Sequence, residues 1–234
     1  MTAAVGMAPV TMADRRVFVG DITRKEFREG VDAGRIRAAV VPVGSTEQHH
    51  EHLAMLHDTS SAAHIGQLAA QELYPAVVVA TPVPIGISEH HMQHRGTLTV
   101  RPEVFCEYVY DVCDSLRRGG LRHLLVLNGH GGNVRPMRER LDDFRARLGL
   151  PLQFNSYWDF IPEEEAKRLL QTGRYPGHAG EFETAFARAA FPERIDEASL
   201  VFDQAQPATA DVGAAMIAFS VQGTVARLKE MMAG

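Results

Sequence analysis

Two short runs of almost only apolar residues constrain the fold most: RAAVVPV at residues 37–43 and LRHLLVL at residues 121–127. Such runs are typical of strands buried on both faces, as in a parallel sheet covered by helices. Two further β-like runs lie at 76–85 and 152–157, and amphipathic stretches separate all four. This alternation predicts an α/β fold with a mostly parallel sheet and helices on both of its faces.

The helices are expected at residues 21–29, 59–73, 102–118, 134–148, 163–171, 183–190 and 210–232. Proline at the first turn and a Gly-Gly pair after the last support the helix at 102–118. Two prolines within 76–85 predict an interrupted strand there. A chain of 234 residues fits one domain over residues 1–234. About the first 15 residues are a candidate for disorder.

Composition excludes several classes of protein. The net charge of −5 argues against nucleic acid or an anionic membrane as the partner. No apolar run reaches the ~20 residues that span a bilayer, and no secretory leader is recognisable. The two cysteines, Cys106 and Cys113, form no CxxC pair, so we expect free thiols, a reducing compartment and a cytoplasmic protein.

Histidine is unusually frequent, with 11 in the chain. Buried imidazoles need hydrogen-bond partners, so such density is rarely structural. Many of these histidines fall in GSTEQHHEHLAMLHD, which follows the first predicted strand at residues 44–58. In an extended segment, Glu47 and His49 face the same side, and Asp58 could bridge to a second ion. Mixed carboxylates and imidazoles suit Zn, Mn, Fe or Co; the alternative is a solvated polar loop.

Three further motifs follow predicted strands or open a helix. NGHGGN at 128–133 carries His130 but lacks the spacing of a phosphate or dinucleotide loop. HAGEFET at 178–184 places Glu181 and Glu183 at a helix start, where simple capping is the alternative reading. GISEHHMQHRGTLTV at 86–100 could also be a structural loop. In parallel α/β folds, ligands bind beyond the C-terminal ends of the strands, where these motifs lie.

Taken together and in this order, the four motifs resemble the creatininase (creatinine amidohydrolase) family over about residues 37–187. The resemblance implies a three-layer α/β/α sandwich and a homo-oligomer, often a hexamer. It implies two divalent transition-metal ions (zinc, manganese or iron). The implied metal ligands are Glu47, His49, Asp58 and His130, with Asp58 bridging. The family's catalytic histidine falls on His178, and its substrate-binding serine and histidine fall on Ser88 and His91.

The departures from the family pattern bear on the substrate. Gly132 stands where creatininase has a metal-binding glutamate, so Glu183 is the expected replacement, with Glu181 as runner-up and otherwise a catalytic candidate. Creatininase has a tryptophan just before the residue that matches His178; this chain has none there, and its only tryptophan is Trp158. Both differences argue against creatinine. His50-Glu51 and His94-Arg95 replace Gly-Pro and Phe-Pro, which predicts a more polar pocket rim and a hydroxylated or anionic substrate.

The resemblance implies a hydrolase that acts on a small polar cyclic amide or related cyclic carbonyl compound. Metal ions would activate water as the nucleophile and stabilise the oxyanion, while His178 supplies a proton to the leaving atom. His91, His94, Arg95, Gly131, Trp158 and Ser88 are the candidate substrate contacts. The alternatives are hydrolysis of an oxidised cyclitol or sugar ring, hydrolysis of a formamide, or a non-catalytic metal-stabilised binding or assembly protein.

Overall fold

The computed structural model describes residues 11–12 and 15–234, so the candidate disorder near the N-terminus falls mostly outside the described residues. The helices are α1 (Arg24–Asp32), α2 (His57–Glu72), α3 (Pro102–Arg118), α4 (Gly131–Leu148), α5 (Glu163–Leu169), α6 (Glu181–Ala190) and α7 (Ala210–Ala233). The strands are β1 (Ala38–Val43), β2 (Val77–Val79), β3 (His123–Asn128) and β4 (Gln153–Ser156). Short 3-10 turns lie at Val19–Asp21, Glu89–His91, Tyr157–Phe160, Pro192–Arg194 and Glu197–Ser199.

The four strands form one sheet in the order β2-β1-β3-β4, and every pair is parallel. β1 and β3 are central, and both are buried almost throughout. The parallel sheet predicted from the apolar runs is therefore confirmed. The predicted interruption of the second strand is also present: β2 ends at Val79, and Val83 pairs separately with Val43 at the end of β1.

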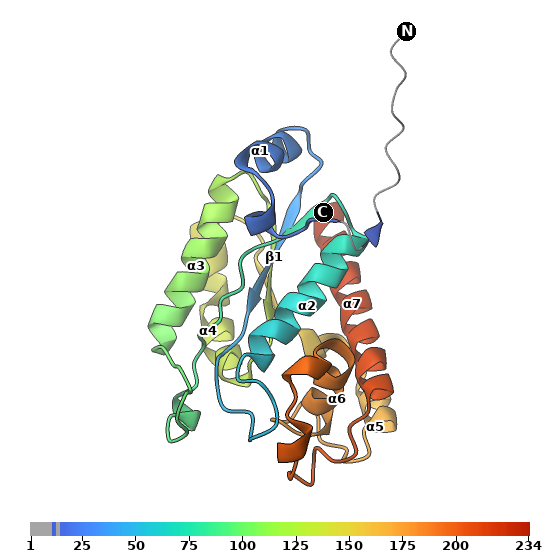
Figure 1. Cartoon of the computed structure of the whole chain (residues 1–234). Helices are drawn as coiled ribbons and strands as arrows, with labels where there is room; N and C mark the ends of the chain where they lie inside the picture. The colour runs from blue at the N-terminus through green and yellow to red at the C-terminus, as the bar shows by residue number, and fades with distance from the viewer. Residues whose placement is uncertain (1–10, 13–14) are drawn as a thin grey trace.

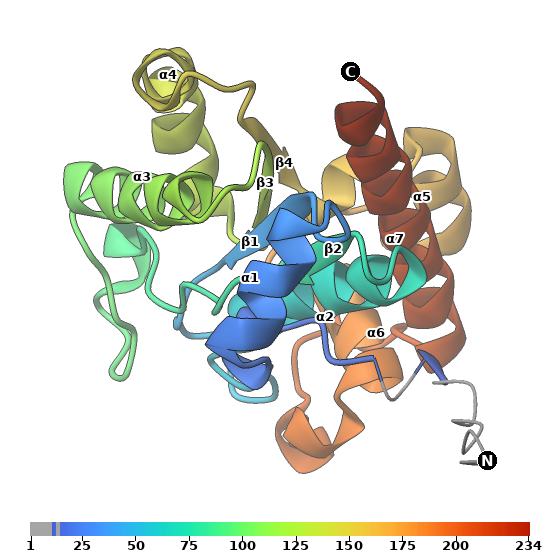
Figure 2. The same ribbon diagram turned by 90° about the horizontal axis from the view of Figure 1, so that it is seen from above.

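Helices cover both faces of the sheet, which gives the expected three-layer sandwich (Figures 1 and 2). α3 and α4 pack on one face, and α2, α6 and α7 pack on the other. Successive residues of β1 alternate between the two cores: Ala39 and Val41 face α3 and α4, while Ala38 and Val40 face α2. This alternation follows from the two-residue period of a strand.

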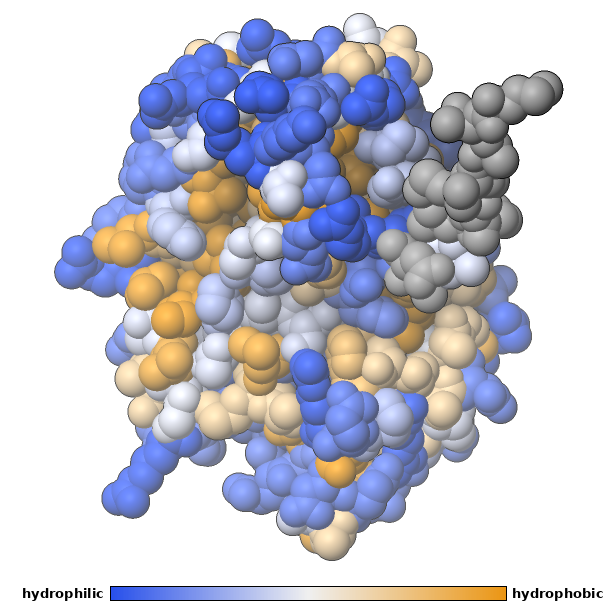
Figure 3. All heavy atoms as spheres, turned by 45° about the horizontal axis from the view of Figure 1, so that its top comes forward, coloured by the Kyte–Doolittle hydropathy of each residue, from blue (hydrophilic) through white to orange (hydrophobic). Residues whose placement is uncertain are grey.

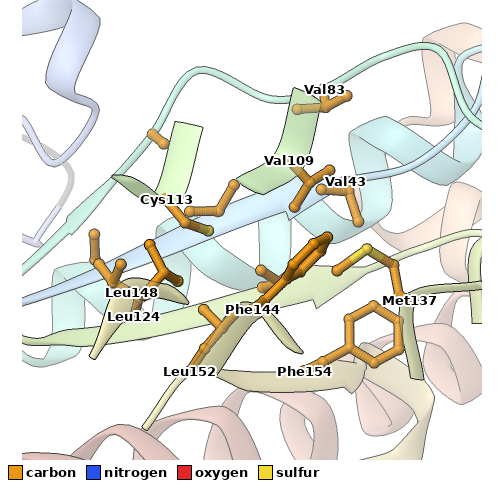
Figure 4. Close-up of a cluster of buried hydrophobic side chains, with 14 of the residues drawn as sticks. Val43, Val83, Val109, Cys113, Leu124, Met137, Phe144, Leu148, Leu152 and Phe154 are labelled. Carbon is orange, nitrogen blue, oxygen red and sulfur yellow. The ribbon is translucent and has the colours of Figure 1, made fainter. Parts of the chain in front are cut away.

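The core between the sheet and α3 and α4 is made of interlocking branched and aromatic side chains (Figure 4). Phe144 and Met137 of α4 and Val109 of α3 are fully buried there. Removing a side chain such as that of Phe144 would cost ~3–5 kcal/mol of stability. A firm core on this face gives the loops at the C-terminal ends of the strands a rigid base.

Within residues 11–12 and 15–234, no helix is long and apolar enough to cross a membrane. Hydrophilic residues are mixed with small hydrophobic groups over the face that carries α1 (Figure 3).

Candidate metal centre

The segment after β1 brings three predicted ligands together. Glu47 and His49 project from a buried, non-helical stretch, and Asp58 is the second residue of α2, where the chain returns. His49 Nε2 lies 2.9 Å from Asp58 Oδ1. All three side chains are at most 3% exposed. The carboxylates and the imidazole therefore meet inside the protein, away from solvent.

The loop after β3 adds His130 to the same cluster. His130 Nδ1 lies 2.9 Å from Asp58 Oδ2 and 3.4 Å from Glu47 Oε1. The two asparagines of NGHGGN hold this loop. The Asn128 side chain accepts the N–H of His130 at 3.1 Å and donates to its carbonyl oxygen at 2.8 Å. Asn133 Nδ2 donates to the Gly44 carbonyl oxygen at 3.0 Å, which ties the loop to the end of β1.

Helix α6 supplies the third carboxylate. Glu183 Oε2 lies 3.7 Å from His49 Nε2 and accepts the backbone N–H of Ala179. Ala179 has a left-handed backbone, with φ 47°. Left-handed non-glycine residues are strained and gather at functional sites. The left-handed conformation of Ala179 turns the chain between His178 and α6, and both His178 and Glu183 line the same pocket.

The cluster places three carboxylates, those of Glu47, Asp58 and Glu183, beside only two imidazoles, those of His49 and His130. Burial would lower the pKa of His49, but the charge of Asp58 and a hydrogen bond to it raise that pKa to about 10. His130 behaves alike: burial opposes the charge, and hydrogen bonds to Asp58 and Glu47 raise its pKa to about 10. Burial raises the pKa of Glu183 to about 7. Without cations, the carboxylates hold protons on the neighbouring rings; bound cations would replace those protons.

The hydrogen bonds prepare both imidazoles for metal coordination. His49 Nδ1 donates to the Glu47 carbonyl oxygen at 3.0 Å, which leaves the Nε2 lone pair facing Asp58 and Glu183. His130 Nε2 lies 3.0 Å from the Ile87 carbonyl oxygen, which leaves Nδ1 facing Glu47 and Asp58. Metal-binding histidines characteristically donate their other N–H to such an oxygen. Glu47 Oε2 is buried without a hydrogen-bond partner. These donors fit divalent transition-metal ions.

A pocket of about 300 Å³ opens onto this cluster. Its walls include His91, Gly131 and Trp158, which are three of the predicted substrate contacts, together with the predicted catalytic His178 and with His90. His178 is 31% exposed and lies with Nδ1 3.6 Å from Glu47 Oε1. Burial, together with the nearby His49, lowers the pKa of His178 to about 4. His178 is therefore neutral at physiological pH and faces both the pocket and the carboxylates.

The other predicted site residues lie elsewhere. Ser88 is fully buried beneath the pocket, where its hydroxyl bonds Ser45 Oγ at 2.6 Å and approaches His130 Nε2 at 3.3 Å. His94 and Arg95 are exposed and are not among the pocket walls. The carboxylate of Glu181 accepts the backbone N–H groups of Gln171 at 2.9 Å and Thr172 at 2.7 Å. Glu181 thus holds the loop before His178 rather than facing the cluster.

Sequence reasoning missed Gln48 and His90. Gln48 lies between two candidate ligands, and its side-chain amide contacts His91 and His178. The ring of His90 stacks on that of His130, with centroids 5.9 Å apart, and forms part of the pocket wall. The signal for His90 was its place in the His-rich stretch; for Gln48 there was only its position within the motif.

Gly132, at the position expected to match a glutamate of creatininase, sits where no side chain fits. A Cβ atom there would lie 2.1 Å from the Ile87 carbonyl oxygen and 2.5 Å from His130 Nε2. Both distances are far below van der Waals contact, so the two atoms of the His130–Ile87 hydrogen bond would be forced apart. A glutamate at position 132 would therefore clash with His130 as it is placed here.

Comparison of sequences finds known proteins similar to this chain. The creatininase profile, described as creatinine amidohydrolase, matches residues 20–231. Creatinine amidohydrolase of Pseudomonas putida is 27% identical over 197 residues, which cover 78% of this chain and 75% of that enzyme. 3-Dehydro-scyllo-inosose hydrolase of Thermotoga maritima is 30% identical over 183 residues, which cover 76% of this chain and 57% of that enzyme.

Solved structures agree with the sequence comparison. A crystal structure of creatinine amidohydrolase superposes with a TM-score of 0.82 at 25% identity, covering 93% of this chain and 98% of that one. A mutant creatininase of Zn–Zn type superposes with a TM-score of 0.79 at 25% identity, covering 92% and 98%. The likeness therefore extends over nearly the whole chain.

Proposed function

The chain belongs to the creatininase family of hydrolases, and on that basis we propose that it hydrolyses a small polar cyclic amide or a related cyclic carbonyl compound in a metal-dependent reaction. One observation carries this proposal: Glu47, Asp58 and Glu183 converge with His49 and His130 in a buried cluster at the base of a small pocket. Such a cluster has no evident structural purpose, because hydrophobic residues would fill the space at lower cost.

We propose that the five residues of this cluster would hold two divalent ions, and that Asp58 would serve both. The preceding contacts support the assignment, as does the Zn–Zn type of a related creatininase. Zinc, manganese and iron are the candidate ions, and one related structure is described as creatininase with Mn. Bound ions would supply Lewis acidity for the carbonyl group and for water. The chain's part is to hold Glu47 and Asp58 ionised and the two imidazoles in their ligating tautomers.

His178 is the proposed proton carrier. It is neutral at physiological pH, it lies beside the carboxylates, and part of its ring reaches the pocket. A neutral imidazole there can take a proton from water and then deliver it to the leaving atom. His91 and Trp158, on the pocket walls, are the proposed substrate contacts. Glu181 is assigned a supporting role, because both of its oxygens bind backbone N–H groups.

The substrate is proposed to be a compound other than creatinine. Position 132, which matches a glutamate of creatininase, is a glycine that has no room for a side chain. The tryptophan of this pocket, Trp158, comes from the turn after β4 instead of the segment before His178. Hydrolysis of an oxidised cyclitol ring is the second candidate, because one relative at 30% identity is named as an inosose hydrolase. A formamide substrate and a non-catalytic binding protein remain the further alternatives.

The test combines metal analysis with a panel of creatinine, other cyclic amides, formamides and keto-cyclitols. We expect up to two transition-metal ions per chain, loss of most metal in Asp58→Ala, and turnover of at least one panel member other than creatinine. Creatinine turnover with kcat/KM of ~10⁴ M⁻¹s⁻¹ or above would refute the substrate proposal. Full metal content in Asp58→Ala would refute the ligand assignment. Metal binding with no turnover would favour the non-catalytic alternative.

A further inference from the structure

One side-chain amide contacts two histidines of the pocket at once. Gln48 Nε2 lies 3.0 Å from His91 Nδ1 and 2.8 Å from His178 Nε2. The other end of the amide is fixed independently, because Gln48 Oε1 accepts the backbone N–H of His50 at 2.9 Å. A backbone N–H can only donate, so the oxygen of Gln48 must face His50 and the NH₂ group must face the two rings.

This orientation determines the proton positions on both rings. An NH₂ group has two hydrogens, one for each ring, so His91 Nδ1 and His178 Nε2 must accept. The remaining nitrogens, His91 Nε2 and His178 Nδ1, then carry the hydrogens. They lie 3.8 Å and 3.6 Å from Glu47 Oε1.

His49 and His130 show the opposite arrangement. Each approaches a backbone carbonyl oxygen with one nitrogen and turns the other toward the carboxylates. Once bound cations replace the protons on these two nitrogens, the lone pairs of His49 and His130 would face the cluster, whereas His91 and His178 present N–H groups to it. The side chains of Glu47, His91 and His178 lie close enough together that, judged by distance alone, they could also hold an ion. The tautomers oppose this, because an N–H nitrogen has no lone pair for a metal.

We propose that Gln48 is a positioning residue that separates the imidazoles of this centre into metal ligands and hydrogen-bond donors. By donating to His91 and His178, it excludes both from coordination and leaves each with an N–H directed toward Glu47. This inference rests on the proposed function for its catalytic consequence, but the tautomers follow from the hydrogen bonds alone.

The test uses the zinc-loaded full chain labelled with ¹⁵N-histidine, because two-bond ¹H–¹⁵N spectra distinguish the two neutral tautomers. We expect the hydrogen on Nδ1 in His178 and on Nε2 in His91. Gln48→Glu keeps the shape but can only accept, so it should move the hydrogen to His178 Nε2 and His91 Nδ1. It should lower kcat/KM by ~10²–10⁴-fold, the usual contribution of a correctly placed proton carrier, with metal content no lower than in the wild type.

Gln93→Glu is the matched control, because it introduces the same charge at an exposed position of the neighbouring loop. It should change neither tautomer. Gln48→Met covers the case in which Gln48→Glu does not fold: without the donor, His178 should lose its Nδ1–H form. Wild-type tautomers in either folded Gln48 variant would overturn the proposal, as would zinc coordination by His91 or His178 in the wild type. If the wild type hydrolyses nothing but shows the expected tautomers, the proposed function fails and the role of Gln48 in fixing the tautomers stands.

Discussion

Gly131 and Gly132 begin α4 side by side, and replacing each with alanine should give opposite results. In Gly132→Ala, the new Cβ would lie 2.1 Å from the Ile87 carbonyl oxygen, whereas at Gly131 no heavy atom lies within 4 Å. Overpacking of this kind costs ~1–3 kcal/mol. Alanine is favoured over glycine within a helix by up to ~1 kcal/mol, and both positions share that gain. The difference in stability between the two variants therefore isolates the clash.

Urea unfolding of the metal-free chain is the appropriate assay, because bound metal would add to the apparent stability. Gly131→Ala should be as stable as the wild type or slightly more stable, and Gly132→Ala should be less stable than Gly131→Ala by ~1–3 kcal/mol. Because the clash also displaces His130 from Ile87, metal affinity should fall by ~10–100-fold in Gly132→Ala alone, as when a hydrogen bond that orients a ligand is lost. Equal stability and equal metal affinity of the two variants would refute the packing argument. Gly132→Glu should likewise lose metal instead of restoring a creatininase-type ligand.

Three other predictions address the site and the core. His50 has φ 51°, so His50→Gly should be more stable than His50→Ala by ~1 kcal/mol, measured by urea unfolding; a more stable alanine variant would contradict strain at this position. Glu183→Gln should lose metal and activity together, whereas His178→Ala should keep its metal and lose ~10²–10⁴-fold in kcat; metal loss in His178→Ala would make His178 a ligand. Burial raises the pKa of Cys106 to about 11 and that of Cys113 to about 12, so both thiols stay protonated at pH 8 and should react with a disulfide reagent only after unfolding; rapid reaction of the native chain would contradict their burial.

The order of strands and helices could be predicted well from the sequence, because buried runs and amphipathic stretches differ in period. The start of α4 could not. The prediction placed it at Val134, since glycines disfavour helices, but the helix begins at Gly131. The reason is tertiary: Gly132 must pass close to Ile87 and His130, and only glycine allows that approach. The prediction also placed the start of α6 at Glu183, but the helix begins at Glu181. The Glu181 carboxylate binds the backbone of the preceding loop, which is a tertiary contact that local sequence does not reveal.

The buried cluster was also accessible from sequence, because its residues lie in motifs at strand ends. The alternation rule brought Glu47 and His49 to the same side, but it also implied that Gln48 points away. The segment is not a regular strand, and Gln48 turns toward His91 and His178 instead. The expected contribution of Arg95 to the pocket rim depended on the path of a loop, which local sequence does not determine; Arg95 is exposed and is not among the pocket walls.

The spread of the cluster along the chain has a consequence for the order of events during synthesis. Glu47, His49 and Asp58 leave the ribosome early, His130 follows after β3, and Glu183 emerges only with α6. A nascent chain that ends before α6 contains Glu47 and Asp58 but lacks Glu183, so its set of proposed ligands is incomplete. We therefore expect metal to be acquired after translation has passed α6. A cell short of metal would then accumulate complete but unloaded chains, not arrested fragments.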